Sequence, residues 1–293
     1  MMGTTARCTC VVTGAGGLVG RHLVPMLAEH WDVIAIARAE GEARPHVQYL
    51  VRDLATDGFT DGLPESVDAV VHLAQSRRFR EFPEGAADVL AVNVTATERL
   101  ARYAASAGAS HFVYASSGGV YAPSSEPFVE EAPIATPAQA GWYQASKLAS
   151  EALLHAYRNL FVPVVLRPFF IYGAGQQRHM LIPRLCDTVR RGDAVQLAGE
   201  DGMLISPTHA TDAARCIVAS LSLTEAATIN VRGPDVLSLR AICELLGSAL
   251  GVTPRFTNTG AAGPAYVADD RRMNALLGPS GAHFAELLHT ILT

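Results

Sequence analysis

The sequence lacks several features that would each point to a particular class of protein. It has no dense run of lysines and arginines, and its formal net charge of −5 gives no electrostatic footprint for nucleic acid or an anionic membrane. Its first apolar stretch, Cys8–Val12, is too short for a signal peptide or for a membrane span of about 20 residues. These absences favour a cytoplasmic protein that binds a small molecule.

Cysteine is scarce and unevenly placed. The five cysteines are odd in number and have no paired spacing with histidines, so they predict neither a disulfide framework nor a metal site. With 49% hydrophobic and 17% charged residues, the chain has the composition of a folded globular protein.

What the sequence does contain is an alternation of short apolar runs and helical stretches. Runs this continuously apolar are typical of parallel strands that are covered by helices on both faces. The expected strands are Cys8–Thr13, Val33–Ala37, Val47–Val51, Ala69–Leu73, Phe112–Ala115 and Val162–Phe170, and the expected helices are Leu18–Glu29, Asp88–Ala107 and Trp142–Asn159. The two longer helices are candidates for a homodimer face.

The pattern becomes smaller and less continuous after residue 172. Helices at Ile182–Arg191, Thr211–Leu221 and Ser238–Leu250 and a strand at Thr228–Val231 are expected there. We therefore predict an α/β fold, with a Rossmann-like doubly wound parallel sheet of about seven strands in residues 1–172. Residues 173–293 would form a smaller α/β substrate-binding lid at the carboxyl edge of that sheet, where open α/β proteins hold ligands.

A glycine-rich turn joins the first strand to the first helix. The segment VVTGAGGLVGRHL places Gly14, Gly17 and Gly20 at regular spacing. Glycine permits the tight turn and the close approach of backbone to a pyrophosphate, which the amino terminus of the following helix attracts. The position of the turn predicts a dinucleotide site.

The ends of the second and third strands bear on the choice of dinucleotide. Arg38 occupies the place where NAD-binding proteins usually carry an acid, and a guanidinium can pair with a ribose 2′-phosphate. NADP is therefore favoured slightly over NAD. Asp53, at the end of the third strand, is placed to accept a hydrogen bond from the adenine amine, although a surface turn would look the same.

Three residues form a candidate catalytic set. Tyr143 and Lys147 lie one helical turn apart, and Ser117 follows a strand end. A neighbouring ammonium favours the phenolate, so we expect Lys147 to lower the pKa of Tyr143 and let it exchange a proton with a substrate oxygen held by Ser117.

Five segments together resemble the extended short-chain dehydrogenase/reductase family, in its nucleotide-sugar epimerase and dehydratase branch. They are TGAGGLVG, HLAQ, YASSGGVY, YQASK and RPFFIYG. The resemblance implies a bound nicotinamide dinucleotide, a catalytic Ser117, Tyr143 and Lys147, and a Lys147 contact to the nicotinamide ribose. The cofactor would lie against Gly14, Gly17, Leu18, Val19, Gly20, Arg38, Asp53, Leu54, Leu73, Ala74, Asn93, Lys147 and Pro168. The substrate would meet Gln75, Ser76, Ser117, Gly118, Phe170 and Arg178.

The sequence departs from that family at two kinds of position. Dehydratases carry an Asp-Glu pair after the serine, whereas Gly118 and Gly119 stand here, so elimination of water is not expected. The acids of the following loop, Glu126, Glu130 and Glu131, are expected to be solvated.

Two arginines that often hold the diphosphate of the substrate are also missing. Ile205 occupies the first place, and the segment GAAGPAY offers none for the second. Replacement cations could come from Arg178, His179, Arg184, Arg271 and Arg272. The cluster Arg77, Arg78 and Arg80 could equally face water or a negative substrate.

The resulting expectation is an NAD(P)-dependent enzyme acting on a nucleotide sugar, either a 4-epimerase or a 4-ketoreductase. An NADPH-dependent reductase of a non-sugar carbonyl compound and a catalytically silent cofactor-binding regulator remain the alternatives.

Overall fold

The computed structural model describes residues 7–260 and 263–292. Two compact units emerge from its contacts, and neither is a continuous stretch of chain. The first unit comprises 1–120, 135–167 and 214–229, and the second comprises 121–134, 168–213 and 230–293. The predicted division at residue 172 stays a prediction.

A seven-stranded sheet organises the first unit. Its strand order is β11-β6-β5-β4-β1-β2-β3, and the neighbouring strands from β6 to β3 in this order pair in parallel. The order reverses direction beside β1, as in doubly wound dinucleotide-binding proteins. The strands are β1 (Cys8–Thr13), β2 (Trp31–Ala37), β3 (Val47–Val51), β4 (Ala69–His72), β5 (His111–Ala115), β6 (Val162–Pro168) and β11 (Ala227–Val231). The predicted fold class is confirmed.

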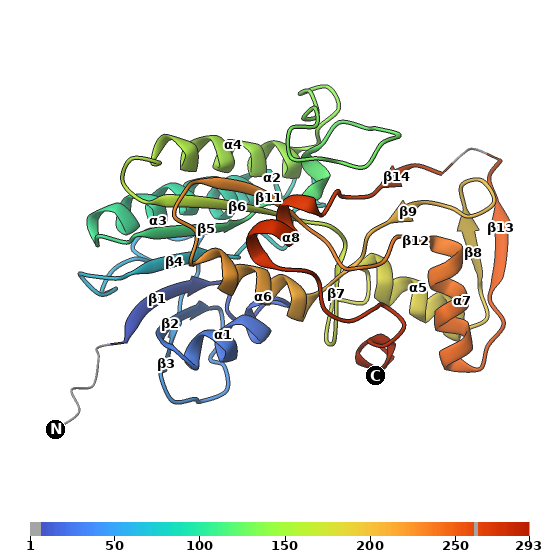
Figure 1. The fold of residues 1–293 in the computed structure, drawn as a ribbon, viewed down its shortest axis with the longest axis horizontal. Helices are drawn as coiled ribbons and strands as arrows, with labels where there is room; N and C mark the ends of the chain where they lie inside the picture. The colour runs from blue at the N-terminus through green and yellow to red at the C-terminus, as the bar shows by residue number, and fades with distance from the viewer. Residues whose placement is uncertain (1–6, 261–262, 293) are drawn as a thin grey trace. The chain divides into compact units, whose positions relative to one another are not determined.

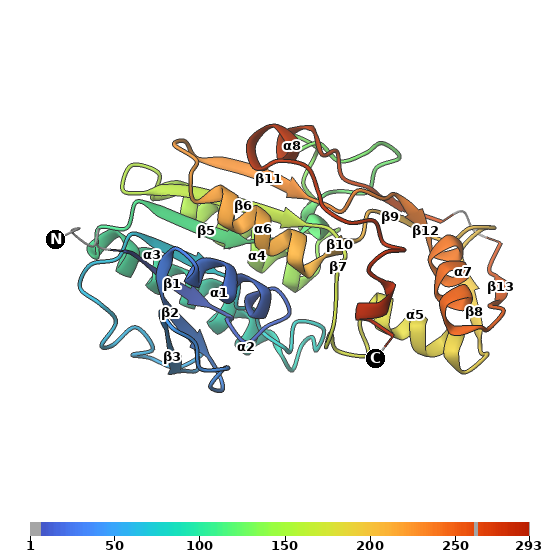
Figure 2. The same cartoon turned by 60° about the horizontal axis from the view of Figure 1, so that its bottom comes forward.

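Helices cover both faces of this sheet, as the continuously apolar strands require. Figures 1 and 2 show α1 and α6 on one face and α3 and α4 on the other. The helical elements are α1 (Gly20–Ala28), α2 (Ala86–Val89), η1 (Leu90–Thr95), α3 (Ala96–Ser106), η2 (Gly118–Val120), α4 (Trp142–Ala156) and α6 (Ala210–Ser220). The helix expected at Asp88–Ala107 is present, with a π-helical turn, η1, inside it.

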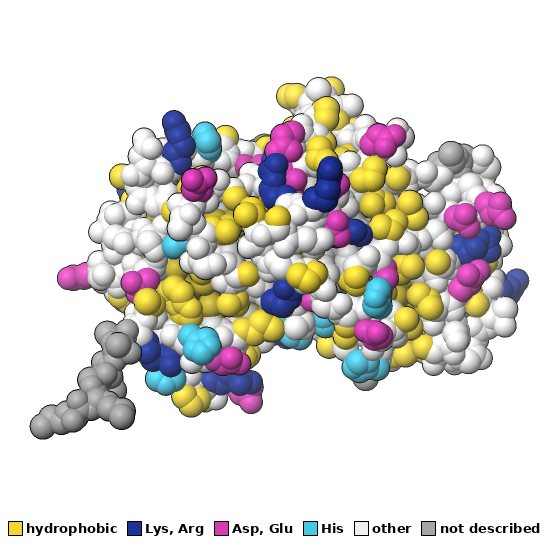
Figure 3. Space-filling view, viewed as in Figure 1, with side chains coloured by type: hydrophobic (Ala, Val, Ile, Leu, Met, Phe, Trp, Pro, Cys, Tyr) yellow, Lys and Arg dark blue, Asp and Glu magenta, His cyan; other side chains and the backbone are white. Residues whose placement is uncertain are grey.

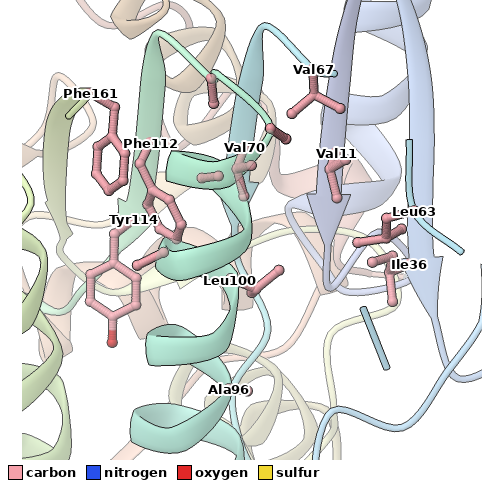
Figure 4. Close-up of a cluster of buried hydrophobic side chains, with 14 of the residues drawn as sticks. Val11, Ile36, Leu63, Val67, Val70, Ala96, Leu100, Phe112, Tyr114 and Phe161 are labelled. Atoms are coloured by element: carbon pink, nitrogen blue, oxygen red, sulfur yellow. The ribbon is translucent and has the colours of Figure 1, made fainter. Parts of the chain in front are cut away.

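The core under α3 is built from side chains of several strands. Phe112 of β5 and Leu100 of α3 are fully buried, and Phe112 stacks on Phe161 with ring centroids 5.4 Å apart. Figure 4 shows these side chains between the sheet and α3, with Tyr114 beside them. This packing fixes the strand ends that carry the candidate site.

Shorter elements make up the second unit. They are β7 (Ile171–Tyr172), α5 (Leu181–Arg190), β8 (Ala194–Leu197), β9 (Leu204–Ile205), β10 (Thr208–His209), β12 (Leu237–Ser238), α7 (Leu239–Leu250), β13 (Arg255–Asn258), β14 (Ala265–Tyr266), α8 (Arg271–Leu277) and η3 (Leu288–Thr290). A core of buried apolar residues from α5, α7 and the segment after α8 holds them together.

Two sequence expectations need correction. The sequence pattern predicts a strand at Thr228–Val231 within the carboxyl-terminal region, but this strand lies at the edge of the main sheet as β11. Phe170 was placed in a strand, whereas β6 ends at Pro168 and Phe170 has a left-handed φ of 42°. No helix in the described residues is long and apolar enough to cross a membrane.

Candidate active site

The glycine turn lies where β1 meets α1 and passes close to the end of β4. Gly14 has a φ of 73°, and a Cβ there would come within 2.7 Å of the Ala74 backbone nitrogen. A Cβ on Gly20 would lie 2.3 Å from the Gly14 carbonyl oxygen. Only glycine fits these two places, and the resulting bare backbone is the kind of cradle that a pyrophosphate needs.

The amino terminus of α1 completes this cradle. No acid occupies the first turn of α1, so nothing in that turn opposes the positive end of the helix dipole. Gly17, Leu18 and Val19 form the approach to the helix, and the Gly17 amide donates to the Gly14 carbonyl at 2.8 Å. The residues present therefore fit a dinucleotide.

The ends of β2 and β3 present two arginines side by side. Arg38 follows β2 and is exposed, and the amide of Arg52, also exposed, donates to the Ala37 carbonyl at 2.9 Å. Sequence reasoning named Arg38 but missed Arg52, whose proximity depends on the β2–β3 register. Asp53 uses its carboxylate to accept from the Ala55 amide at 2.9 Å, and Leu54 behind it is buried.

Tyr143 and Lys147 share one face of α4, and Ser117 follows β5. The Tyr143 hydroxyl donates to Gln75 Oε1 at 3.0 Å, and Lys147 Nζ donates to the Ala115 carbonyl at 2.7 Å. Lys147 Nζ lies 5.8 Å from the centre of the Tyr143 ring. The structure thus brings together the three residues of the predicted catalytic set and the predicted substrate residue Gln75 in the first unit.

The proton affinities of this set differ from the sequence expectation. Burial raises the pKa of Tyr143 to about 12, while hydrogen bonding with Ser117 and the charge of Arg80 act in the lowering direction. Burial also lowers the pKa of Lys147 to about 7. The expectation that the ammonium makes Tyr143 acidic is therefore wrong for the protein alone, because desolvation outweighs the charges around the phenol.

Arg80 reaches the site through an aromatic contact. The Phe79 ring packs on Tyr143 with centroids 5.0 Å apart, and the Arg80 guanidinium lies 5.2 Å from the Phe79 ring centre. Its neighbour Arg78 is ion-paired with Glu81 at 2.7 Å. Within the predicted arginine cluster, the charge of Arg80 is the one that lowers the pKa of Tyr143.

A buried polar network supports the site from behind. Asn93, inside the π-helical turn, accepts from the Ser76 amide at 2.8 Å and donates to Ser146 Oγ at 2.9 Å. Both ends of its side-chain amide are thus used within the protein. His72, which sequence reasoning missed, bonds Thr13 at 2.6 Å and Thr97 at 3.0 Å, and burial and Lys147 lower its pKa to about 3.

Two of the predicted substrate residues, Phe170 and Arg178, lie in the second unit, whereas Ser76 and Gly118 belong to the first. Arg178 is held in a bidentate ion pair by Asp187, with Nε to Oδ2 at 2.9 Å. Phe170 packs edge-on against Tyr266 at 6.2 Å, and its left-handed backbone costs on the order of 1–3 kcal/mol for an aromatic residue. Such strain is concentrated at functional sites in proteins.

One of the loop acids is not solvated as expected. The Glu130 side chain is 4% exposed and accepts from the Asn230 amide at 2.9 Å. Glu131 is 68% exposed to solvent, as expected, and is also ion-paired with Arg272 of α8. Both acids attach the loop to neighbouring segments of the second unit.

A glycine cradle on a doubly wound sheet and a Tyr-Lys helix beside it define a Rossmann-like enzyme of the short-chain dehydrogenase/reductase type. The chain belongs to the NAD dependent epimerase/dehydratase family, whose sequence model matches residues 10–231. The family predicted from the five segments is confirmed.

Individual relatives agree with this membership. The chain is 30% identical over 190 residues to a UDP-glucuronate 4-epimerase of Thermodesulfobacterium geofontis, a match that covers 64% of this chain and 58% of that protein. It is 27% identical over 265 residues to a dTDP-4-dehydro-6-deoxy-D-allose reductase of Streptomyces bikiniensis, covering 83% and 81%. The solved structure of MoeE5 in complex with UDP-glucuronic acid and NAD matches with a TM-score of 0.82 and 28% identity, covering 96% and 97%.

Proposed function

We propose that the chain is a nicotinamide-dependent enzyme that oxidises or reduces one carbon of a nucleoside diphosphate sugar, as a 4-epimerase or a 4-ketoreductase. The observation that carries the proposal is the Tyr143 hydroxyl bonded to Gln75, with Ser117 and Lys147 beside it in the unit that holds the glycine cradle. The activities of the relatives named above support it.

The residues of the site have separate tasks in such a reaction. The nicotinamide supplies the hydride acceptor or donor. Tyr143 would exchange a proton with the substrate oxygen and Ser117 would hold that oxygen. The Lys147 ammonium would hold the ribose hydroxyls of a bound dinucleotide and stabilise the phenolate. Gln75 keeps the phenol oriented at 3.0 Å until a substrate oxygen replaces it.

The raised pKa of Tyr143 bears on the direction of proton transfer. With a pKa of about 12, the phenol is protonated at neutral pH and is ready to donate to a carbonyl oxygen. Accepting a proton from a hydroxyl requires the phenolate, which the cationic form of the cofactor and Lys147 would favour. A ketoreductase needs only the first step, and an epimerase needs both in turn.

The choice between these activities is measurable without knowing the pathway. Purified protein would be incubated with UDP-glucose, UDP-glucuronic acid or a dTDP-4-keto sugar, with NAD, NADH, NADP or NADPH. An epimerase interconverts sugars without a net change in the absorbance of the reduced nicotinamide, whereas a reductase consumes the reduced dinucleotide and lowers that absorbance. If no nucleotide sugar is converted while simple carbonyl compounds consume NADPH, the enzyme is a reductase of a non-sugar carbonyl, which the absent arginines favour.

Arg80 favours an anionic group on the reacting sugar. Its guanidinium is exposed above Phe79, one ring away from Tyr143, and makes no ion pair with a described carboxylate. A charge-assisted bond to a substrate carboxylate would contribute about 1.5–3 kcal/mol. We therefore expect UDP-glucuronic acid to be turned over with a higher kcat/KM than UDP-glucose.

For the cofactor, we propose NADP ahead of NAD. Arg38 and Arg52 present two exposed guanidinium groups at neighbouring strand ends, where the adenosine ribose lies in doubly wound proteins. NAD remains the alternative, as the MoeE5 complex contains it.

We also propose a cytoplasmic homodimer that pairs through the long helices. The α4 helix packs beside η1 and α3, and Leu90 on η1 is 46% exposed. Light scattering coupled to size-exclusion chromatography would report a dimer for the native chain and a monomer for Leu90→Asp.

A further inference from the structure

Lys147 is the only lysine in the chain, since the other 22 of its 23 basic residues are arginines. Lys147 is 1% exposed, and within the described residues its ammonium group donates one hydrogen bond, to the Ala115 carbonyl at 2.7 Å. Taking a charge into such a place is unfavourable, and burial lowers the pKa of Lys147 to about 7. At neutral pH the amine is therefore close to losing the proton that the proposed mechanism needs.

Glu151 lies one helical turn beyond Lys147, on the same face of α4. Its carboxylate is 12% exposed and is held at both oxygens. Arg167 of β6 donates Nε to Oε1 at 3.1 Å and Nη2 to Oε2 at 2.6 Å, and the buried Ser116 hydroxyl donates to Oε1. This bidentate geometry fixes the carboxylate in one orientation.

Other ionisable groups also lie around Lys147. Tyr143 shares its helix, Tyr114 faces it from β5 with Nζ 4.9 Å from the ring centre, and His72 lies on β4. Burial keeps both tyrosines and His72 neutral at pH 7. The turns η1 and η2 carry no ionisable side chain. On α2, Asp88 accepts a hydrogen bond from the Ser76 hydroxyl. The charged residues of α3 are Glu98, Arg99 and Arg102.

Glu151 is the charge that acts on Lys147 among the described residues, in the direction that raises its pKa. Arg167 in turn neutralises part of that carboxylate, because it donates to both of its oxygens. The two members of this ion pair therefore affect Lys147 in opposite directions.

We propose that Glu151 is a positioning residue that keeps the single lysine of the chain charged for catalysis, and that Arg167 and Ser116 set how strongly it does so. The proposal rests on the proposed function, since the charged amine has a task only in a nicotinamide site. The catalytic pair Tyr143 and Lys147 is thereby extended by one helical turn to Glu151, which would act on the reaction through Lys147.

The single lysine permits a direct test. Protein grown with lysine labelled with carbon-13 at Cε gives one side-chain resonance, whose pH titration reports the pKa of Lys147. We expect Glu151→Gln to lower that pKa by about one pH unit, the size typical for loss of one close opposite charge. We expect Arg167→Gln to raise it, because the carboxylate is then no longer neutralised.

Matched variants separate this role from simple structural support. Glu151→Asp keeps the charge and should restore most of the shift, and Glu98→Gln removes an exposed acid of α3 and should leave the pKa unchanged. If Glu151→Gln does not fold, the double variant Glu151→Gln/Arg167→Met removes both charges. Its pKa should still be lowered, but by less than about one pH unit, because the opposing charge of Arg167 is lost as well. If the ion pair were merely structural, Glu151→Gln and Arg167→Gln would shift the pKa of Lys147 in the same direction.

The same variants have a kinetic readout. The rate should fall as the pH rises through the pKa of Lys147, so Glu151→Gln should move the alkaline limb of the kcat profile to lower pH. An unchanged or raised pKa in Glu151→Gln, or a lowered one in Arg167→Gln, overturns the proposal. A predicted shift in a protein that converts no nucleotide sugar leaves the effect of Glu151 intact and refutes the proposed function instead.

Discussion

The two units use their cations differently. In the first unit, Arg38, Arg80 and Lys147 make no ion pair with a described carboxylate, although other cations of that unit, such as Arg78 and Arg167, do. In the second unit most arginines are paired with nearby acids: Arg178 with Asp187, Arg232 with Asp270, Arg240 with Asp201, Arg271 with Asp269, and Arg272 with Glu131.

The difference follows from how each unit is stabilised. Long strands and helices bury much of the apolar surface of the first unit, so some of its charges are left available to ligands. The second unit has several strands of only two residues, and ion pairs tie its loops and short helices together. An arginine of the second unit is thus weaker evidence for substrate binding than an unpaired arginine of the first unit. Of the five predicted replacement cations, His179 and Arg184 are exposed and make no ion pair within the described part of the chain.

Removing the phenol oxygen should have the largest effect. Tyr143→Phe takes away the proton donor and its bond to Gln75 while keeping the ring that packs on Phe79. We expect kcat to fall by about 10²–10⁴-fold, with dinucleotide affinity within about threefold of the native value. Steady-state turnover and cofactor titration measure the two quantities, and unchanged turnover would support a catalytically silent regulator.

A substitution in the glycine turn should have the next largest effect. Gly20→Ala would place a Cβ 2.3 Å from a backbone oxygen, so the turn must shift. We expect a loss of more than about 2 kcal/mol in the free energy of unfolding and at least about tenfold weaker dinucleotide binding. Gly16→Ala is the matched control, since its nearest neighbour, Ala37 Cβ, is 3.6 Å away and folding should be unaffected. Equal losses in both variants would show that steric closeness in the turn is not the cause.

Strand positions, the glycine turn and the Tyr-Lys spacing could be predicted from the sequence because each is a local pattern. The joining of β11 to the main sheet could not, since a strand does not reveal its neighbour. The same holds for the site: Gln75 and Tyr143 are 68 residues apart, and His72 and Thr13 are 59 apart, so their contacts depend on strand order. The direction of the Tyr143 pKa was mispredicted for a related reason. Spacing identifies neighbouring charges, but it does not give the burial that outweighs them.

Arg38 offers a test of cofactor choice within the first unit. Arg38→Gln should weaken NADP binding by about 10-fold or more, the loss expected for one charge-assisted bond to phosphate, and leave NAD binding nearly unchanged. Arg44→Gln, which changes an arginine already paired with Glu42, should affect neither. Calorimetric titration gives both affinities. A parallel loss for NAD and NADP would mean that Arg38 does not read the 2′-phosphate.

Burial of the Lys147 ammonium should lower the stability of the folded chain at neutral pH. Its pKa is about 7 in the folded chain against 10.5 as the reference for the unfolded one, so between these values the unfolded chain holds the extra proton. Stability from this group therefore rises with pH across that window and is lowest below it. Lys147→Met should unfold at least about 2 °C higher at neutral pH, and the difference should shrink towards pH 10. Calorimetry at several pH values checks the trend, and a constant difference would contradict it.

The smallest effect should come from the second unit. Arg178 is exposed and already occupied by Asp187, so Arg178→Gln should change KM for a nucleotide sugar by less than about threefold, because exposed ion pairs contribute about 0–1 kcal/mol. Arg184→Gln is the informative partner, since it removes an exposed arginine of the same helix region that makes no ion pair with a described acid. A large rise in KM for Arg178→Gln would mean that the substrate displaces Asp187. Cations of the second unit would then also be available to a ligand, because their carboxylate partners would be displaced when the ligand binds.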